Sequence, residues 1–185
     1  MKSFGLTDKG KVRKDNQDCF IIEKCQPKSC LIVGLCDGMG TTLVGGVIKY
    51  NGNGYIINVG DSRAYHISRR SNSIYQITRD HSLVEELMEA GAITREQART
   101  HPQKNVITRA LGTDDAVVCD YFEFSLQSGD VLLLCSDGLS NIVSDLEMLD
   151  YAREYQEPEL LCRALMSKAL NRGARDNVTV VAVMR

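Results

Sequence analysis

The sequence predicts an α+β protein in which antiparallel strands come first and most of the helices follow. Runs of β-branched residues and leucine recur at short, even spacing over residues 2–78, separated by Gly, Asn and Asp. This spacing is typical of an antiparallel sandwich or barrel. Patterns that begin a helix start at Ser82 and recur toward the C-terminus. We therefore expect helices to pack on an antiparallel core.

The apolar runs place the strands. Alternation and turn signals predict strands over residues 2–7, 18–24, 31–36, 41–50, 54–60, 62–68 and 73–78, then over 117–125, 130–136 and 177–184.

Capping residues place the helices. Ser82 with Glu85 forms a capping box that opens a polar helical hairpin, whose first helix closes at Gly91 and whose second opens at Thr94. Two further helices begin at Ser144 and Pro158. The last one should lie on a sheet, because one of its faces is apolar through Leu161, Ala164, Leu165 and Ala169.

Length and composition indicate one domain, residues 1–185. With 185 residues, 43% of them hydrophobic, the chain can bury one substantial core. With a net charge of -2 and scattered Lys and Arg, the chain has no basic patch that would indicate nucleic-acid binding. It also has no basic amphipathic stretch that would indicate binding to a membrane surface. The N-terminal segment lacks an apolar signal region, and no apolar run could span a bilayer. We expect a cytoplasmic protein without nucleic-acid or membrane partners.

The seven cysteines are interpreted as reduced thiols. Their number is odd, and Cys36, Cys135 and Cys162 lie inside apolar runs, which suits small buried hydrophobes better than a disulfide framework. The spacing of the first four cysteines is not that of a zinc knuckle.

Four aspartates stand at the ends of apolar runs, and they point to function. They are Asp37, Asp61, Asp137 and Asp176. Buried strands deliver such residues to the rim of a sheet, where crowded carboxylates repel one another unless a cation joins them. Oxygen ligands favour Mg²⁺ or Mn²⁺. We therefore predict a hard-metal centre.

Eight segments, in order along nearly the whole chain, resemble the bacterial metal-dependent protein phosphatases of the 2C family. They are R-x-x-N-Q-D at 13–18, CDGMG at 36–40, GTTLV at 40–44, VGDSRAY at 59–65, RDHSLVEELMEAGAIT at 79–94, HPQKNVITRALG at 101–112, LLLCSDGL at 132–139 and RDNVTVV at 175–181.

The resemblance implies an αββα sandwich, two antiparallel sheets flanked by helices. It also implies hydrolysis of phosphoserine or phosphothreonine in proteins, with phosphoproteins made by a Ser/Thr kinase as partners. The helical hairpin, at about 80–112, resembles the flap that borders the substrate groove of the family.

The resemblance also assigns metal ligands. Asp37 would bridge two Mn²⁺ or Mg²⁺ ions, the Gly38 carbonyl would bind one of them, and Asp137 and Asp176 would bind the other. Asp61 would hold a weaker third ion. Two close metals lower the pKa of water and neutralise phosphoryl charge, so that no protein nucleophile is required.

Two further residues acquire roles through the resemblance. Asp18 would hold a metal-bound water through a hydrogen bond. Arg13, remote from the metals, would clamp the substrate phosphate with its fork of donors. Of the three histidines, His66 is expected to be structural, and His81 and His101 to cap turns or face solvent.

The chain departs from the family pattern after DGMG. Relatives have Gly-His and a helical crossover there, whereas here Gly40 runs directly into Thr41. The first helical layer and the histidine usually assigned as general acid are therefore missing. Asn141 stands where some relatives offer an acidic ligand for the third metal.

The missing layer should expose apolar surface. The strand over 41–50 carries Leu43 and Val47 on one face and Val44 and Ile48 on the other, a pattern for a strand covered on both sides. An uncovered sheet predicts a homo-oligomer. The alternative function is a weak or inactive phosphoprotein-binding or decoy module, or an internally deleted fragment that oligomerises. Retention of all the predicted acidic ligands favours an active enzyme over these alternatives.

Overall fold

Ten strands form two antiparallel sheets, as predicted. The computed structural model describes residues 1–25, 29–38, 42–113 and 115–185. One sheet, here called the terminal sheet, has the order β1-β10-β9-β6-β7, and the other, the hairpin sheet, has the order β2-β3-β4-β5-β8. The bounds are β1 (Lys2–Asp8), β2 (Cys19–Lys24), β3 (Cys30–Asp37), β4 (Thr42–Lys49), β5 (Asn53–Val59), β6 (Arg63–Ser68), β7 (Ser73–Gln76), β8 (Asp120–Ser125), β9 (Val131–Cys135) and β10 (Val178–Met184).

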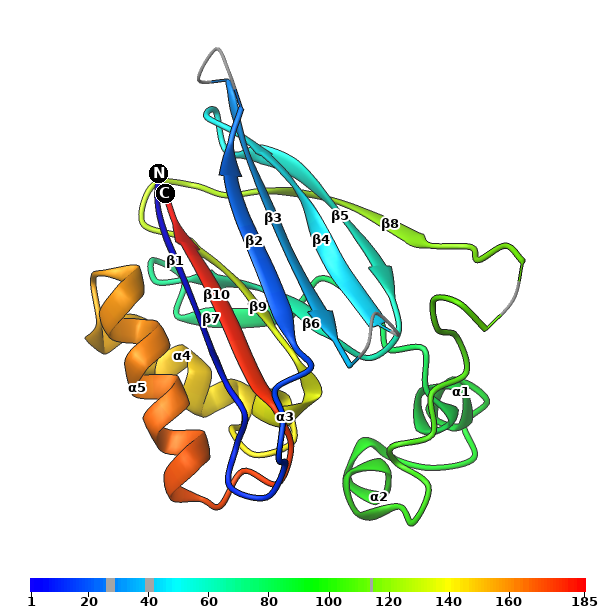
Figure 1. Cartoon of the computed structure of the whole chain (residues 1–185). Helices are drawn as coiled ribbons and strands as arrows, with labels where there is room; N and C mark the ends of the chain where they lie inside the picture. Colours follow the sequence, from blue (N-terminus) through cyan, green and yellow to red (C-terminus); the bar gives the residue numbers. More distant parts are fainter. Residues whose placement is uncertain (26–28, 39–41, 114) are drawn as a thin grey trace.

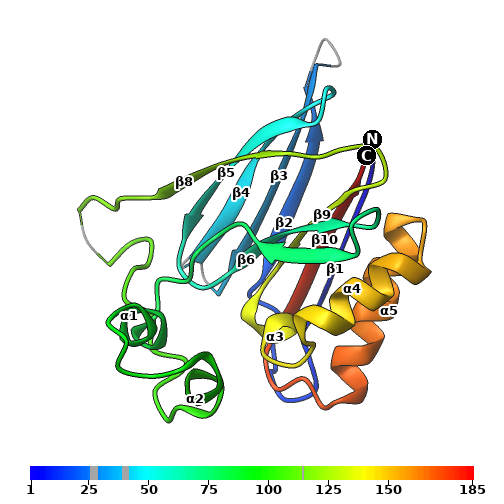
Figure 2. The same ribbon diagram turned by 180° about the vertical axis from the view of Figure 1, so that it is seen from behind.

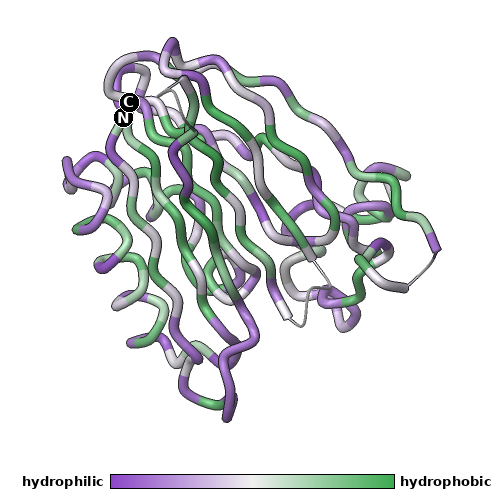
Figure 3. Tube along the Cα trace, turned by 45° about the horizontal axis from the view of Figure 1, so that its top comes forward, coloured by the Kyte–Doolittle hydropathy of each residue, from purple (hydrophilic) through white to green (hydrophobic). Residues whose placement is uncertain are grey.

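The two sheets face each other across one apolar core (Figure 1). Strand β9 shows how the period of two divides its side chains. Leu132 and Leu134 join Val44 and Ile56 of the hairpin sheet, whereas Leu133 points to the other side of the terminal sheet. Figure 3 shows the hydrophobic residues concentrated along these central strands.

Helices α4 (Asp145–Glu154) and α5 (Pro158–Asn171) cover the outer face of the terminal sheet (Figures 1 and 2). The predicted apolar face of α5 is confirmed by the full burial of Leu161, Leu165 and Ala169. The short helix α3 (Asp137–Ser140) was not predicted.

The outer face of the hairpin sheet has no such cover: within the described ranges, no helix packs on it. Ile21 is 53% exposed and Tyr121 is 56% exposed on this face. In β4, Val44 and Ile48 are fully buried toward the core, while Leu43 and Val47 are only partly buried. The expectation of a missing helical layer is thus confirmed, although the junction at residues 39–41 lies outside the described residues.

The helical hairpin lies beyond the end of the sheets (Figure 1). It contains α1 (Leu83–Glu89) and α2 (Arg95–Thr100). The Ser82 side chain caps α1, and the capping box of α2 pairs Thr94 with Gln97. Over the part of the chain that the structure describes, no helix has the length and apolar character needed to cross a membrane.

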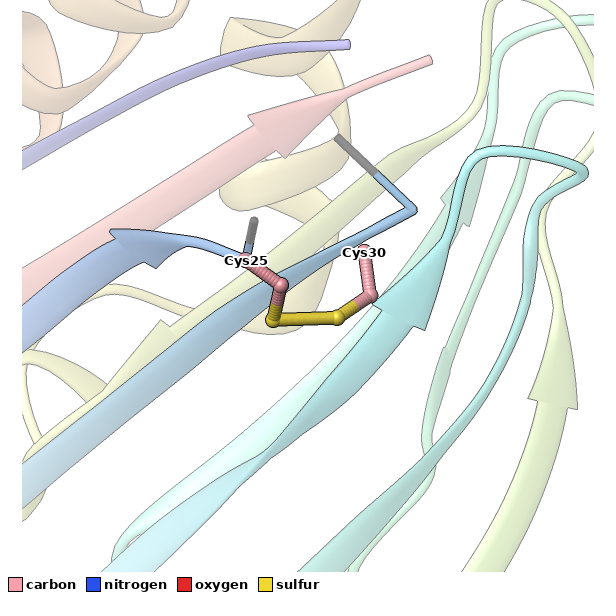
Figure 4. Close-up of a disulfide and its surroundings, with 2 residues drawn as sticks. All are labelled: Cys25 and Cys30. Carbon is pink, nitrogen blue, oxygen red and sulfur yellow. A yellow bond between two sulfur atoms is a disulfide. The ribbon is translucent and has the colours of Figure 1, made fainter. Parts of the chain in front are cut away.

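One disulfide corrects the interpretation that all cysteines are reduced. Cys25 and Cys30 are bonded, with their Cα atoms 5.4 Å apart (Figure 4). Cys25 directly follows β2 and Cys30 begins β3, and Cys25 N donates to Cys30 O at 3.1 Å. Cys135 and Cys162 are buried free thiols, as expected.

Candidate metal centre

The predicted aspartates meet at one end of the sandwich. Asp37 ends β3, Asp61 follows β5, Asp137 begins α3 directly after β9, and Asp176 lies just before β10. The two sheets thus each supply two of the four. This arrangement confirms that the carboxylates lie at the rim of the sheets.

These carboxylates interact strongly. Burial, together with the charges of Asp137, Asp18 and Asp61, raises the pKa of Asp37 to about 9. Burial and then Asp176 raise the pKa of Asp137. Asp61 has its pKa raised to about 7 by burial and then by Asp137. Such shifts mark a cluster in which negative charge is unfavourable without a cation.

Asp18 carries a buried oxygen without a partner. Its Oδ2 accepts a hydrogen bond from Thr179 Oγ1 at 2.7 Å, while Oδ1 has no hydrogen-bond partner among the described residues. Burial raises the pKa of Asp18, against the lowering effect of its hydrogen bond with Thr179. A buried oxygen without a hydrogen-bond partner destabilises the folded state unless a water molecule or an ion binds to it.

The strand ends that carry the ligands are held tightly together. Ser136 N donates to Thr179 O at 3.1 Å, and Thr179 N donates to Ser136 Oγ at 2.9 Å. A Cβ on Gly138 would lie 1.9 Å from the carbonyl oxygen of Asn177. Only glycine fits this close approach, which sets the start of α3 against the start of β10.

Asn177 is a site residue that sequence reasoning missed. Its Nδ2 donates to the carbonyls of Lys9 and Asp15, each at 3.0 Å, and its Oδ1 accepts from Gln17 N at 2.9 Å. These bonds fix the loop between β1 and β2, which carries Arg13. The RDN motif at 175–177 was the available signal, but nothing local shows which loop the amide holds.

Arg13 lies at the cluster, which corrects the expectation that it would be remote from the ligands. Its Nη2 donates to Asp176 Oδ2 at 2.8 Å, and this bond raises the pKa of Arg13. About half of its side chain remains exposed. The guanidinium therefore stands at the border between the carboxylates and solvent.

Gly38 adopts the turn that its predicted role needs. Its φ of +69° is left-handed, which favours glycine directly after Asp37. Asn141 Nδ2 donates to Asp137 Oδ2 at 3.1 Å, so this amide holds a predicted metal ligand.

Beside Asp61 stands an ion pair, Arg63 with Asp80, that the sequence did not predict. The Arg63 guanidinium donates to both oxygens of Asp80, with Nε 2.9 Å from Oδ2, and Gln76 Nε2 donates to Asp80 Oδ1 at 2.7 Å. This pair links the VGDSRAY segment to the start of the flap. A cavity of about 430 Å³ opens here, between α1 and α3, with Asp61 and Asp137 in its wall.

The histidines have structural partners. His66 binds Asp130 at 2.8 Å, as expected of a structural residue. His81 differs from its prediction because it is buried; its Nδ1 accepts from Gly60 N at 3.0 Å, and its Nε2 lies 3.2 Å from Asp120. It therefore anchors the start of the helical hairpin to the sheet rather than facing solvent. His101 Nδ1 accepts from Gln103 N within a turn.

The residues present fit a hard divalent cation. The donors are all oxygens, burial and then neighbouring carboxylates raise the pKa of Asp37, Asp61 and Asp137, and one buried oxygen of Asp18 lacks a partner in the described chain. Three or more ligating side chains already gathered around a single point are not found among the described residues. The fit thus rests on donor chemistry and charge.

Comparison with known proteins gives a consistent result. Residues 88–185 match the family described as Stage II sporulation protein E (SpoIIE). The serine/threonine phosphatase stp of Listeria welshimeri is 43% identical over 149 residues, which cover 80% of this chain and 58% of that protein. Protein phosphatase PhpP of Streptococcus pneumoniae is 43% identical over 146 residues, again 58% of its length. The chain thus spans less than two thirds of these curated relatives.

Solved structures show the same relationship over more of the fold. A bacterial serine phosphatase is 31% identical with a TM-score of 0.90, covering 98% of this chain and 96% of that one. The serine/threonine phosphatase Stp1 from Staphylococcus aureus is 30% identical with a TM-score of 0.91, covering 99% and 94%. As the eight motifs predicted, the chain belongs to the SpoIIE and 2C-type phosphatase family.

Proposed function

We propose that this chain hydrolyses phosphoserine and phosphothreonine in proteins with two Mn²⁺ or Mg²⁺ ions. The observation that carries the proposal is the gathering of these carboxylates at one end of the sandwich, where burial and then neighbouring carboxylates raise the pKa of Asp37 and Asp137 and where Asp18 Oδ1 has no partner among the described residues. Asp37 and the Gly38 carbonyl would hold one ion, and Asp37, Asp137 and Asp176 the other. Asp61 would contribute to a weaker third site. Ions bound there neutralise phosphoryl charge and lower the pKa of water.

Asp18 and Arg13 would act on the reacting groups. Thr179 holds one oxygen of Asp18, which leaves Oδ1 to accept a hydrogen bond from the attacking water. Arg13 contacts Asp176 through Nη2 and is about half exposed, so its fork of donors could also meet a phosphate oxygen.

The cavity beside the cluster suits a phosphopeptide. Its wall joins acidic groups with the cations Arg63, Arg95 and Lys104. It borders the flap on one side and Asp137 on the other. A peptide lying here would present its phosphorylated residue to the carboxylate rim.

Among the described residues, no histidine is placed to protonate the leaving group. The three histidines of the chain all lie in its described part, and each has contacts elsewhere. A general acid contributes about 10²–10⁴ in rate. We therefore propose that the chain favours leaving groups that need no proton.

A second candidate is a weak or inactive phosphoprotein-binding or decoy module, or an internally deleted fragment that oligomerises. The exposed apolar face of the hairpin sheet favours this candidate. Sedimentation of the wild type and of Ile21→Ser with Tyr121→Ser tests the association; a wild type that is monomeric at high concentration would remove it.

Hydrolysis assays separate the two functions. With Mn²⁺, the chain should hydrolyse p-nitrophenyl phosphate and, more slowly, a phosphothreonine peptide. Asp137→Asn should abolish both activities, whereas Asp150→Asn, on the exposed side of α4, should leave them unchanged. Metal-independent peptide binding without turnover of either substrate would support the decoy instead.

A further inference from the structure

The hairpin of β2 and β3 carries two cross-strand pairs of cysteines. Cys19 lies opposite Cys36 in a continuous register that runs to Lys24 opposite Leu31. The next step of that register is Cys25 opposite Cys30, where Cys25 N donates to Cys30 O at 3.1 Å. The pairs are six residues apart on each strand. Because six is even, both pairs lie on the same face and belong to the same class of pair.

The bonded pair, Cys25 and Cys30, shows the geometry expected of the pair Cys19 and Cys36. Cys25 and Cys30 form a disulfide with a Cα separation of 5.4 Å. Directly opposite residues of this class stand about 5.5 Å apart, within the 4.4–6.8 Å range that a disulfide spans. The Cα atoms of Cys19 and Cys36 therefore stand at a separation that a disulfide can span.

The second pair is directly opposed in the register and within reach of solvent. Cys19 is exposed and Cys36 is partly exposed, on the outer sheet face that no described helix covers. An oxidant can thus reach Cys19 first, with Cys36 positioned to react with the product.

The position of this pair couples it to the carboxylate cluster. Cys19 directly follows Asp18, and Cys36 directly precedes Asp37. A disulfide holds its Cβ atoms about 3.8 Å apart, compared with about 4.5–5.5 Å for an unbonded cross-strand pair. The bridge would draw the two Cβ atoms together by roughly 0.7–1.7 Å, which exceeds the roughly 0.5 Å that a preorganised site tolerates.

We propose that a peroxide oxidises Cys19 and Cys36 to a second cross-strand disulfide, and that this disulfide weakens metal binding by the adjacent aspartates. The Cys19 sulfur attacks a peroxide oxygen, the O–O bond breaks, and a sulfenic acid and water form. The Cys36 sulfur then displaces the hydroxyl, so that the S–S bond forms and a second water leaves. The two sulfurs lose two electrons, which the peroxide takes up.

The disulfide between Cys25 and Cys30 cannot replace this oxidant. Six residues of strand separate the two pairs by about 20 Å. The second half of the inference rests on the proposed function, whereas formation of the disulfide does not.

Peptide mapping tests the disulfide. The full chain and its variants Cys19→Ser, Cys36→Ser and, as a matched control, Cys119→Ser are treated with hydrogen peroxide, desalted and digested. Trypsin places Cys19 and Cys36 in different peptides, because Lys24 and Lys28 separate them. A Cys19–Cys36 link that dithiothreitol reverses is expected in the wild type and in Cys119→Ser. Absence of the link, or scrambled links among all the cysteines, would overturn the inference.

Calorimetry with Mn²⁺ tests the coupling. Oxidised wild type should bind Mn²⁺ about tenfold more weakly than reduced wild type, the size of effect typical of a disturbed ligand support. Dithiothreitol should restore the affinity, and Cys19→Ser should not respond to peroxide. Equal affinities would overturn the coupling. A reduced protein that binds no Mn²⁺ would overturn both the coupling and the proposed function, while the peptide map would still decide the disulfide.

Discussion

Replacing Asp37 by asparagine should stabilise the metal-free protein while removing its response to metal. The pKa of Asp37 is raised to about 9, whereas that of an unfolded aspartate is about 4. Between these values the folded state holds a proton that the unfolded state has released, so wild-type stability falls as pH rises. Each pH unit costs up to about 1.4 kcal/mol, which gives an upper bound of about 4 kcal/mol at pH 7. Because Asp37 is only partly buried and shares its cluster, we expect a gain of about 1–3 kcal/mol.

The assay is thermal unfolding with a chelator at several pH values. For a chain of this size the gain corresponds to a rise in Tm of roughly 2–12 °C at pH 7, shrinking toward zero near pH 4. Asp150→Asn, an exposed aspartate of α4, is the control and should change little. Adding Mn²⁺ should raise the Tm of the wild type alone. A variant that is less stable than the wild type at every pH would refute the reasoning that the carboxylates repel one another.

Three further predictions follow from individual contacts. Arg13→Ala should raise KM for a phosphopeptide at least about tenfold, because a charged hydrogen bond contributes about 1.5–3 kcal/mol. The control Arg163→Ala, on α5, should leave KM unchanged. Equal KM values for Arg13→Ala and the wild type would show that Arg13 is only a surface charge. Mn²⁺ binding should release protons, and the affinity should rise from pH 6 to pH 8, because burial and a neighbouring aspartate raise the pKa of Asp61 to about 7. Calorimetry in two buffers counts the released protons. An affinity that does not change with pH would contradict this prediction. Gly138→Ala should lower Tm by several degrees, because its Cβ would lie 1.9 Å from Asn177 O; an unchanged Tm in thermal unfolding would argue against the close approach.

The strands and caps could be predicted because their signals are local. Alternation over residues 54–60 anticipates β5, and the capping box of Ser144 with Glu147 begins α4. The aspartates at the ends of apolar runs follow from the same logic, since a buried strand carries its last residue to the rim of its sheet.

The contacts between distant segments could not be predicted in this way. His81 looked like a capping residue, but its burial depends on Gly60 and Asp120, which reach it through the fold. Arg13 was predicted to clamp a phosphate remote from the metals, and only the packing of its loop near the start of β10 brings it to Asp176.

The disulfide was missed for a related reason. Strands over 18–24 and 31–36 were predicted, but the spacing of the cysteines was compared with zinc motifs rather than with the register of a hairpin. The pairing of β2 with β3, which ends at Lys24 opposite Leu31, brings Cys25 to Cys30, and this pairing cannot be read from either strand alone.

The central claim, that the aspartate cluster is a divalent metal centre, is tested most directly by titrating Mn²⁺ into the metal-free chain in a calorimeter. The wild type should bind Mn²⁺ below millimolar concentration, and Asp137→Asn should lose most of that binding while remaining folded by circular dichroism. A folded wild type that shows no heat of binding at millimolar Mn²⁺, or an Asp137→Asn variant that binds as tightly as the wild type, would contradict the claim.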